Sequence, residues 1–352
     1  MTEGKECYGW AARDSSGVLE PFTFTRRPTG PNDVTFRVTH CGMCHAELIF
    51  CLDKNGHFPM VPGHEVAGVV TEVGSNVTKF KIGDHVGVGT FVRSCLNCET
   101  CKDDMQQVCS KVVWTYNGVD WDGTVTAGGY SNCMVVDQEH VLSIPEGMPL
   151  AEAAPLLCAG ITVYSPMMRH GMNKAGQTLG VVGLGGLGHL AVKFGKAFGM
   201  KVTVLSTSES KKEEALTVLG ADAFVNTSDP AQLEAARMTI HNIVDTVPVH
   251  HPLDVYLPLL KLKGTIVLVG FPHEPLQFTA YNLHPGLRSI SGSVTGSIAE
   301  TQEMLEFCAK NNVLPIIETV DIKDCNENLK RMKEKDVRYR FVIDVEHTLT
   351  RT

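Results

Sequence analysis

The sequence predicts an α/β protein with two domains, one rich in β-strands and one built on a doubly wound parallel sheet. Three observations lead to this prediction. The chain has 352 residues, enough for two domains. Short strand-like segments separated by frequent turns fill roughly its first 150 residues, as in a compact β domain. From about Pro155 onward, strand-like and helix-like segments alternate, as in a doubly wound sheet.

The two ends of the chain carry the β-rich pattern. We expect strands at residues 34–39, 65–73 and 84–89. Glycine, proline, asparagine and aspartate mark turns at residues 28–30, 74–76 and 81–84. Towards the C-terminus we expect helices at 300–310 and 326–334 and strands at 315–320 and 338–345.

The middle of the chain alternates between the two kinds of element. We expect strands at residues 179–182, 202–205, 223–225, 243–245 and 265–269, and helices at 188–198, 210–219, 230–237 and 253–262. This alternation predicts a parallel sheet covered by helices.

Composition and charge limit the classes of function. Hydrophobic residues make up 43% and charged residues 20% of the chain, as in an ordinary globular protein. A net charge of −8 and a pI near 6.0 argue against nucleic acid or an anionic membrane as the main partner. No apolar run approaches the ~20 residues needed to span a bilayer, and glycines and polar side chains interrupt the longest candidate, residues 179–198. Twelve cysteines and no signal-peptide character at the N-terminus favour a reducing compartment, with a cytoplasmic location as the expectation.

Four cysteines lie close together in the sequence: Cys95, Cys98, Cys101 and Cys109. Four thiolates at this spacing suit one tetrahedral Zn²⁺ ion. A disulfide framework is the alternative, but such frameworks belong to small secreted domains. Because four cysteines leave no coordination position for a substrate, we predict a structural rather than a catalytic zinc.

A glycine-rich segment follows the first strand of the alternating region and precedes a predicted helix. It consists of Gly183, Leu184, Gly185, Gly186, Leu187 and Gly188. Glycines in this pattern allow a tight turn and a close approach of the backbone to a pyrophosphate, to which the helix N-terminus offers free N–H groups. A plain turn is the alternative, but the position between a strand and a helix favours a dinucleotide-binding loop.

The end of the next strand bears on the choice of nicotinamide cofactor. NAD sites usually carry an acidic residue there, which binds the ribose 2′-hydroxyl. This chain has Ser206, Thr207 and Ser208, followed by Lys211 and Lys212. Small hydroxyls leave room for a 2′-phosphate and lysine adds positive charge, so we predict NADP(H), although nearby Glu209 weakens the argument. If the lysines are only solvated helix residues, the cofactor is NAD.

A second set of possible metal ligands is spread over the chain: Cys44, His64, Glu65 and Cys158. Sulfur, imidazole and carboxylate ligands suit a catalytic zinc with one open coordination position. A buried cysteine is more often a core residue, however, and a lone histidine is usually not a ligand. Spacing alone does not decide between these interpretations.

Several segments together resemble the zinc-dependent medium-chain alcohol dehydrogenases. They are residues 41–45, 62–65, the four-cysteine segment, 157–162 and 183–188, and the closing segment 336–344 narrows the resemblance to the plant cinnamyl alcohol dehydrogenases. The resemblance spans essentially the whole chain. It implies a GroES-like catalytic domain at residues 1–158 and 297–352, and a Rossmann NADP-binding domain at 159–296. It also implies two zinc ions per chain, a small-molecule substrate and a homodimer.

The resemblance implies roles for individual residues as well. Cys44, His64 and Cys158 would hold the catalytic zinc, and Glu65 would replace its water ligand in some states. His45 and Thr162 would lie at the cofactor. Trp114 matches an aromatic residue of the substrate pocket, with ordinary core packing as the alternative. Val294 and Thr295 stand where larger apolar residues are common, and Glu47 stands where an aspartate can orient the zinc histidine.

The chain departs from this family beside Cys44. Ala46 and Ile49 stand where the family usually has a threonine or serine and a histidine, which normally relay a proton from the substrate oxygen. Neither side chain can carry a proton. The leading hypothesis is an NADPH-dependent zinc oxidoreductase of plant specialised metabolism that interconverts cinnamaldehyde-type aldehydes and alcohols. The alternatives are an iminium or conjugated C=C reductase of alkaloid metabolism on the same fold, and a zinc-stabilised nucleotide-binding protein without catalysis.

Overall fold

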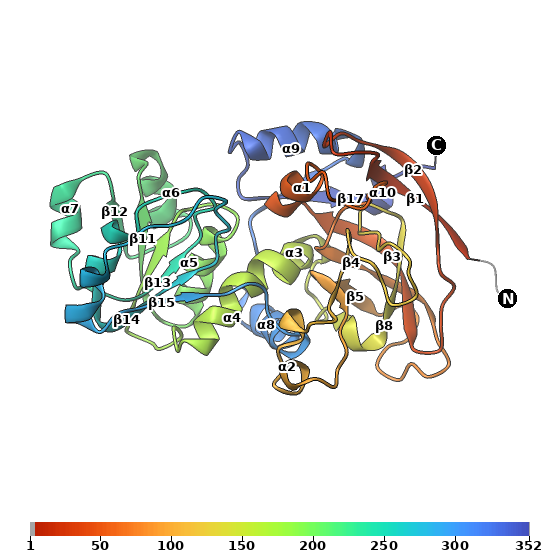
Figure 1. Ribbon diagram of the computed structural model, residues 1–352, viewed down its shortest axis with the longest axis horizontal. Coiled ribbons are helices and arrows are strands. Elements are labelled where there is room, and N and C mark those ends of the chain that lie inside the picture. Colours follow the sequence, from red (N-terminus) through yellow and green to blue (C-terminus); the bar gives the residue numbers. More distant parts are fainter. Residues whose placement is uncertain (1–3, 352) are drawn as a thin grey trace. The chain divides into compact units, whose positions relative to one another are not determined.

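The computed structural model describes residues 4–351 and divides into two compact units (Figure 1). The first unit runs to Cys158 and resumes at Gly296, and the second unit is Ala159–Thr295. The chain therefore leaves the first unit, forms the second and returns.

The first unit is built on a seven-stranded, mostly antiparallel sheet. Its strand order is β16-β17-β3-β4-β5-β9, and β8 pairs with β3. These strands are β3 (Asp33–Gly42), β4 (Val66–Val73), β5 (His85–Val88), β8 (Cys133–Asp137), β9 (Leu142–Ser143), β16 (Ile317–Val320) and β17 (Arg340–Asp344). Two small antiparallel sheets accompany it: β1 (Lys5–Ala12) with β2 (Leu19–Arg26), and β6 (Phe91–Arg93) with β7 (Val113–Trp114).

The first unit also contains mostly short helices. They are α1 (His45–Phe50), α2 (Glu99–Lys102), α3 (Leu150–Pro155), α8 (Ile298–Asn311), α9 (Cys325–Lys333) and α10 (Val345–Thr348). The longest of them, α8, begins at a capping box: the N–H of Glu300 donates to the Ser297 hydroxyl, and the Glu300 carboxylate accepts from the Ser297 N–H. Asn312 ends it in the left-handed conformation.

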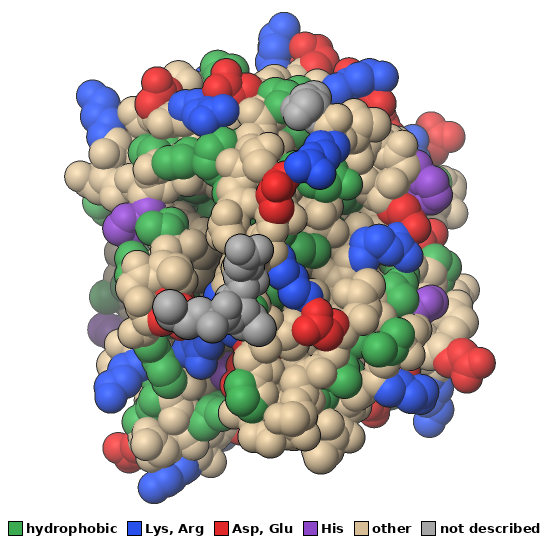
Figure 2. Space-filling view, turned by 90° about the vertical axis from the view of Figure 1, so that its right-hand side faces the viewer, with side chains coloured by type: hydrophobic (Ala, Val, Ile, Leu, Met, Phe, Trp, Pro, Cys, Tyr) green, Lys and Arg blue, Asp and Glu red, His purple; other side chains and the backbone are tan. Residues whose placement is uncertain are grey.

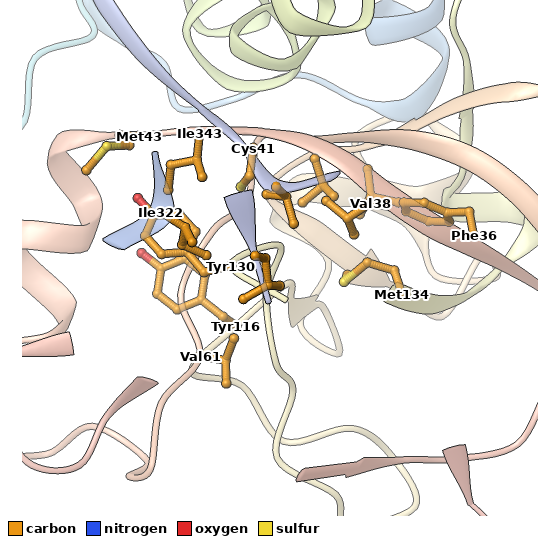
Figure 3. Close-up of a cluster of buried hydrophobic side chains, with 14 of the residues drawn as sticks. Phe36, Val38, Cys41, Met43, Val61, Tyr116, Tyr130, Met134, Ile322 and Ile343 are labelled. Atoms are coloured by element: carbon orange, nitrogen blue, oxygen red, sulfur yellow. The ribbon is translucent and has the colours of Figure 1, made fainter. Parts of the chain in front are cut away.

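The core of the first unit is apolar and lies against the large sheet (Figure 3). Phe36 and Val38 of β3 pack with Met134 of β8 and Ile343 of β17, all nearly inaccessible to solvent. Tyr130, a large and fully buried side chain, belongs to the same cluster. Cys41 near the end of β3 and Val66 at the start of β4 also belong to this core, so it holds in place the backbone next to Cys44, His64 and Glu65.

The second unit contains a six-stranded parallel sheet in the order β12-β11-β10-β13-β14-β15. The strands are β10 (Thr178–Val182), β11 (Lys201–Ser206), β12 (Ala223–Asn226), β13 (Ile240–Asp245), β14 (Leu260–Leu268) and β15 (Ser289–Gly292). Its helices are α4 (Ile161–Arg169), α5 (Gly188–Ala197), α6 (Lys212–Thr217) and α7 (Pro230–Ala235). The strand order reverses beside β10, which confirms the predicted doubly wound fold.

One predicted helix is wrong. Residues 253–262 form two short 3-10 turns, Leu253–Val255 and Leu257–Leu259, and the chain then enters β14 at Leu260. Pro258 lacks the N–H that an α-helix needs and its ring clashes with the preceding turn. The apolar periodicity of this segment comes from leucines buried in the core of the second unit.

The expectation about apolar runs also needs correction. The helical segment Leu150–Arg169 is 20 residues long and is apolar enough, by length and composition alone, to cross a bilayer. It contains α3, a π-helical turn (Leu156–Gly160) and α4. Of its most apolar window, 78% is buried inside the protein, as in a core helix.

Figure 2 shows one face of the molecule. Acidic and basic side chains are interspersed across it, with apolar side chains between them, and neither sign of charge gathers into a continuous patch.

Candidate active site and metal centres

The four cysteines of the predicted structural site come together in space. The Sγ atoms of Cys95 and Cys101 lie 3.9 Å apart, those of Cys98 and Cys109 lie 3.8 Å apart, and those of Cys95 and Cys109 lie 3.5 Å apart. A tetrahedron with Zn–S bonds of about 2.3 Å has S–S edges of about 3.8 Å. The donor set and its dimensions therefore fit one zinc ion.

The local backbone is arranged for thiolates at this site. The N–H of Cys98 points to the Cys95 sulfur at 3.4 Å, and the N–H of Lys111 points to the Cys109 sulfur at 3.3 Å. The Thr100 hydroxyl lies 3.1 Å from the Cys98 sulfur and lowers the pKa of that thiol to about 6. Hydrogen bonds of this kind stabilise the deprotonated form that binds a metal.

The second predicted set of ligands also converges. One possible ligand atom from each of Cys44, His64, Glu65 and Cys158 lies within 4.8 Å of the other three. The two sulfurs are 4.0 Å apart, and His64 Nε2 is 3.1 Å from the Cys158 sulfur. Two sulfurs and one imidazole nitrogen form a ligand set that leaves a catalytic zinc one open position.

Three different backbone features bring these ligands together. Cys44 is the N-cap residue of α1, two residues after the end of β3. His64 and Glu65 precede β4, and the N–H of Gly42 at the end of β3 donates to the Glu65 carbonyl over 2.9 Å. Cys158 lies in the π-helical turn Leu156–Gly160, a kind of irregularity common at functional sites. A Cβ atom at Gly42 would collide with the Glu65 carboxylate, so this position needs glycine.

Glu47 holds both His64 and the start of α1. Its Oε1 lies 3.0 Å from His64 Nδ1, and its Oε2 accepts a hydrogen bond from the Cys44 N–H over 2.5 Å. Glu47 is fully buried, and His64 is only 5% exposed. The carboxylate favours a proton on Nδ1, which leaves the Nε2 lone pair on the side of Cys158. Tyr116 stacks on the His64 ring, with ring centroids 5.7 Å apart.

A buried ion pair lies behind the ligands. Arg340 of β17 pairs with Oε1 of Glu65, and both side chains are buried. The other carboxylate oxygen, Oε2, is buried without a hydrogen-bond partner, so it is available to bind a metal ion. Sequence reasoning gave Arg340 no role, although an arginine inside the apolar run of β17 is itself a signal of a buried partner.

Charges in this group are strongly coupled. Hydrogen bonding from Cys158, together with His64, holds the pKa of Cys44 well below its usual range. Burial raises the pKa of Glu65 to about 7, although Arg340 opposes the shift. Cys44 is thus poised as a thiolate, the form in which cysteine binds a metal.

The glycine-rich loop in the second unit has the backbone of a phosphate-binding turn. Gly183 follows β10 with φ of +82°, and a Cβ atom at Gly188 would collide with the Gly183 carbonyl oxygen. At Gly185 a Cβ would meet no atom within 4 Å, so the backbone there is open to a ligand. The loop ends at the N-terminus of α5, whose free N–H groups favour an anion.

The residues predicted to select the cofactor lie beside this loop. The Lys211 ammonium donates to the Leu184 carbonyl over 2.9 Å, so its charge lies next to the glycine-rich turn. Ser206 ends β11, and its hydroxyl accepts from the Ser208 N–H over 3.2 Å. Glu209 is turned to Lys212 and Asn226 instead, at 2.8 and 3.3 Å. The carboxylate that weakened the prediction of NADP(H) is therefore engaged elsewhere.

The remaining predicted residues differ in exposure. In the first unit, Ala46 and Ile49 are half-buried on α1, whereas His45 is exposed. Trp114 ends β7 with 41% of its surface exposed, which argues against simple core packing. The others belong to the second unit: Thr162 is half-buried on α4, Val294 is 44% exposed and Thr295 is buried.

Comparison with known families identifies both units. Residues 30–146 match the alcohol dehydrogenase GroES-like domain, and residues 186–310 match the zinc-binding dehydrogenase domain. A probable cinnamyl alcohol dehydrogenase 1 from Oryza sativa subsp. japonica is 56% identical over 97% of both chains. A cinnamyl alcohol dehydrogenase 2 from Rauvolfia serpentina is 52% identical over 98% of this chain and 96% of its own.

Solved structures agree with these relatives. A cinnamyl alcohol dehydrogenase from Sorghum bicolor is 50% identical and superimposes with a TM-score of 0.96 over 99% of this chain and 100% of its own. The enzyme of this kind from Helicobacter pylori, solved in complex with NADP(H), is 37% identical, with a TM-score of 0.92 over 99% of this chain and 100% of its own. The chain thus belongs to the cinnamyl alcohol dehydrogenase family of zinc-containing medium-chain alcohol dehydrogenases.

Proposed function

We propose that the protein is an NADPH-dependent oxidoreductase that reduces cinnamaldehyde-type aldehydes to alcohols and runs the reverse oxidation. Cys44, His64 and Cys158 hold one zinc ion, and Cys95, Cys98, Cys101 and Cys109 hold another. The family relationship supports this activity, and a relative with this fold binds NADP(H). The observation that carries it is the buried group of Cys44, His64, Glu65 and Cys158, with His64 oriented by Glu47.

The residues of the first unit bind and orient the reacting carbonyl. A zinc ion held here would supply Lewis acidity that polarises a carbonyl. Glu47 keeps the imidazole of His64 in one tautomer, and Arg340 balances the charge of Glu65. Trp114 offers a flat, half-exposed surface to a phenyl ring.

The residues of the second unit bind the cofactor, which supplies the hydride. The glycine-rich turn and the start of α5 take its pyrophosphate, and Thr162 contributes from α4. Ser206, Thr207 and Ser208 leave space for a 2′-phosphate, and Lys211 adds positive charge.

The pair Ala46 and Ile49 on α1 favours a second candidate reaction. Neither side chain can pass a proton to a substrate oxygen. A reaction that forms no alkoxide would not need such a proton transfer from α1. Such a reaction is the reduction of an iminium ion or a conjugated C=C bond.

The experiment is a comparison of NADPH consumption with cinnamaldehydes, aliphatic aldehydes and cyclic iminium compounds, with identification of each product. The aldehyde proposal expects cinnamyl alcohols as the fastest-formed products. Faster turnover of an iminium or enone would favour the second candidate. Absence of any NADPH turnover in a protein with two zinc ions would contradict both.

We further propose that the protein is a cytoplasmic homodimer. The strand β15 forms one edge of the parallel sheet, and Phe271, Tyr281 and Leu287 in the same unit are 74%, 72% and 66% exposed. An unpaired strand edge with exposed apolar residues favours pairing with a second copy. Light scattering coupled to gel filtration tests it, and a monomer at micromolar concentration would contradict it.

A further inference from the structure

Two cysteines outside both metal groups face each other across neighbouring strands of the first unit. Gly9 of β1 forms an antiparallel bridge with Ser131, flanked by backbone hydrogen bonds of 2.9 and 3.0 Å. Counting two residues outward from this bridge places Cys7 of β1 opposite Cys133 of β8. The Gly9–Ser131 pair occupies a non-hydrogen-bonded position, where facing side chains come closest.

The two thiol groups are in direct contact. Their Sγ atoms lie 3.1 Å apart, in contact but not bonded to each other. Facing residues on neighbouring antiparallel strands have Cα atoms about 4.5–5.5 Å apart, within the range of about 4.4–6.8 Å that a disulfide needs. Cys7 is fully buried, whereas Cys133 is half-buried. A small reagent can therefore reach Cys133 first.

A cation lies beside this pair. The Arg26 Nη2 group donates to the carbonyls of Ala127 and Gly128 over 2.9 and 3.1 Å, and to the Ser131 hydroxyl over 3.0 Å. Among residues 4–351, no carboxylate forms an ion pair with Arg26. Its charge interacts with the two cysteine sulfurs and with the ring of Phe24, whose centroid is 5.1 Å from the guanidinium carbon.

The environment separates the two thiols chemically. A hydrogen bond from Cys7 lowers the pKa of Cys133, and Arg26 and Lys5 add to this effect. The same hydrogen bond, together with burial, raises the pKa of Cys7. Cys133 is therefore the nucleophile of the pair, because the thiolate is the reactive form of cysteine.

We propose that Cys7 and Cys133 are a redox modification site, at which a small disulfide such as oxidised glutathione converts the two thiols into a cross-strand disulfide. The Cys133 thiolate attacks one glutathione sulfur and breaks the S–S bond, which gives a mixed disulfide and one glutathione thiolate. The Cys7 sulfur, after losing its proton, attacks the Cys133 sulfur and releases the second glutathione. Two protein thiols are oxidised, one glutathione disulfide is reduced, and two glutathione thiols leave.

The cross-link would have a structural consequence. It would join residues 126 positions apart in the sequence, so it would restrict the unfolded chain strongly. It would also link the β1–β2 hairpin covalently to β8, the strand that pairs with β3. We therefore expect the oxidised protein to unfold at a higher temperature than the reduced protein.

The test uses the full-length, zinc-containing protein. It is incubated with oxidised glutathione, alkylated, and digested without reductant for mass spectrometry. The expected product is a peptide pair linked through Cys7 and Cys133, with zinc content unchanged and Tm raised by several degrees. Dithiothreitol should reverse both changes.

Three variants make the test specific. Cys7→Ser should accumulate a glutathione adduct on Cys133 without the rise in Tm, and Cys133→Ser should leave Cys7 unmodified. Cys308→Ala is the matched control, because it removes a fully buried thiol from α8 and should form the cross-link as the unaltered protein does.

Free thiols at both positions in the oxidised protein would overturn the proposal, even if a variant failed to fold. A glutathione adduct that persists on Cys133 while Cys7 stays free, or a cross-link that forms only after zinc is lost, would also overturn it.

Discussion

Glu47 contacts two ligands of one candidate metal group at once. One carboxylate oxygen lies 3.0 Å from His64 Nδ1 and the other accepts from the Cys44 N–H over 2.5 Å. The same buried side chain therefore orients the imidazole and fixes the end of the helix that presents the thiolate. Because a different oxygen makes each contact, the two roles of Glu47 can be separated by substitution.

The first prediction separates these roles. Glu47→Gln keeps an oxygen for the Cys44 N–H but removes the charge beside His64 Nδ1. We expect NADPH turnover or zinc affinity to fall about 10–100-fold, as for other partners of metal-binding histidines. Elemental analysis and steady-state kinetics measure the two effects. Glu47→Asp is the control: it keeps the charge on a shorter side chain and should lose less. Full zinc content and full turnover in the glutamine variant would show that the contact does not matter.

The second prediction concerns the four-cysteine site. Cys101→Ser removes one of four ligands, so the protein should lose about one zinc ion per chain and its Tm should fall, because this site holds a loop rather than a substrate. Zinc analysis and thermal unfolding measure both. Cys308→Ser, which lies outside both metal groups, is the control and should keep its zinc. A Cys101→Ser protein that stays as stable as the parent and loses only turnover would mean that the two sites are assigned the wrong way round.

The third prediction tests cofactor choice. Ser206→Asp places a carboxylate at the end of β11, where it would repel a 2′-phosphate and accept from a ribose hydroxyl. We expect the preference for NADPH over NADH to fall by at least about tenfold, which corresponds to about 1.4 kcal/mol. The ratio of kcat/KM for the two cofactors measures it. Ser206→Asn, similar in size but uncharged, should shift the ratio less. Equal use of both cofactors by the unaltered protein would contradict the assignment.

The fourth prediction concerns acid stability. His140 is 1% exposed, its Nε2 lies 3.0 Å from the Ser94 hydroxyl, and its Nδ1 has no hydrogen-bond partner. Burial lowers the pKa of His140 from 6.5 to about 4. As the pH falls, the unfolded chain therefore takes up this proton before the folded protein does. The stability contributed by neutral His140 is complete above about pH 6.5 and is lost as the pH falls towards 4.

The size of this effect follows from the shift in pKa. It corresponds to about 3 kcal/mol of unfolding free energy over the whole window, as an upper value. His140→Gln keeps a hydrogen-bonding group but cannot titrate, so its unfolding free energy should fall less steeply with pH. Urea unfolding at several pH values measures this. Parallel pH profiles for the two proteins, in the same zinc-containing buffer, would contradict the prediction.

Local sequence patterns were sufficient for most of the fold and for one metal site. The alternation of strands and helices after residue 155 predicted the parallel sheet. The spacing of Cys95 to Cys109 predicted a group of four thiols, and the structure brings these thiols together. Cys44 and Cys158 are 114 residues apart in the sequence, so only the family resemblance suggested that they meet. Arg340 was missed for the same reason, since its partner Glu65 is 275 residues away. The false helix at 253–262 shows that apolar periodicity fails where a proline removes the backbone donor.

The last prediction addresses the half-buried pair on α1. If an aldehyde is the substrate, its reduction ends with proton delivery to an oxygen, and neither Ala46 nor Ile49 can take part in that step. Replacing them together, Ala46→Thr with Ile49→His, should raise aldehyde turnover. General acid–base assistance is worth about 10²–10⁴-fold, so even partial recovery would be visible in kcat.

The matched control for this double change is Ala46→Val with Ile49→Phe, which fills similar space without a transferable proton. A rise in aldehyde turnover only for the threonine and histidine variant would support proton transfer as the limiting step. If the natural substrate is an iminium ion or a conjugated C=C bond, both double variants should leave that reaction unchanged or slow it, because the small apolar surface then belongs to the pocket. No gain for aldehydes, in a variant whose crystal structure places the new hydroxyl and imidazole beside the bound cofactor, would show that the missing relay does not limit this enzyme.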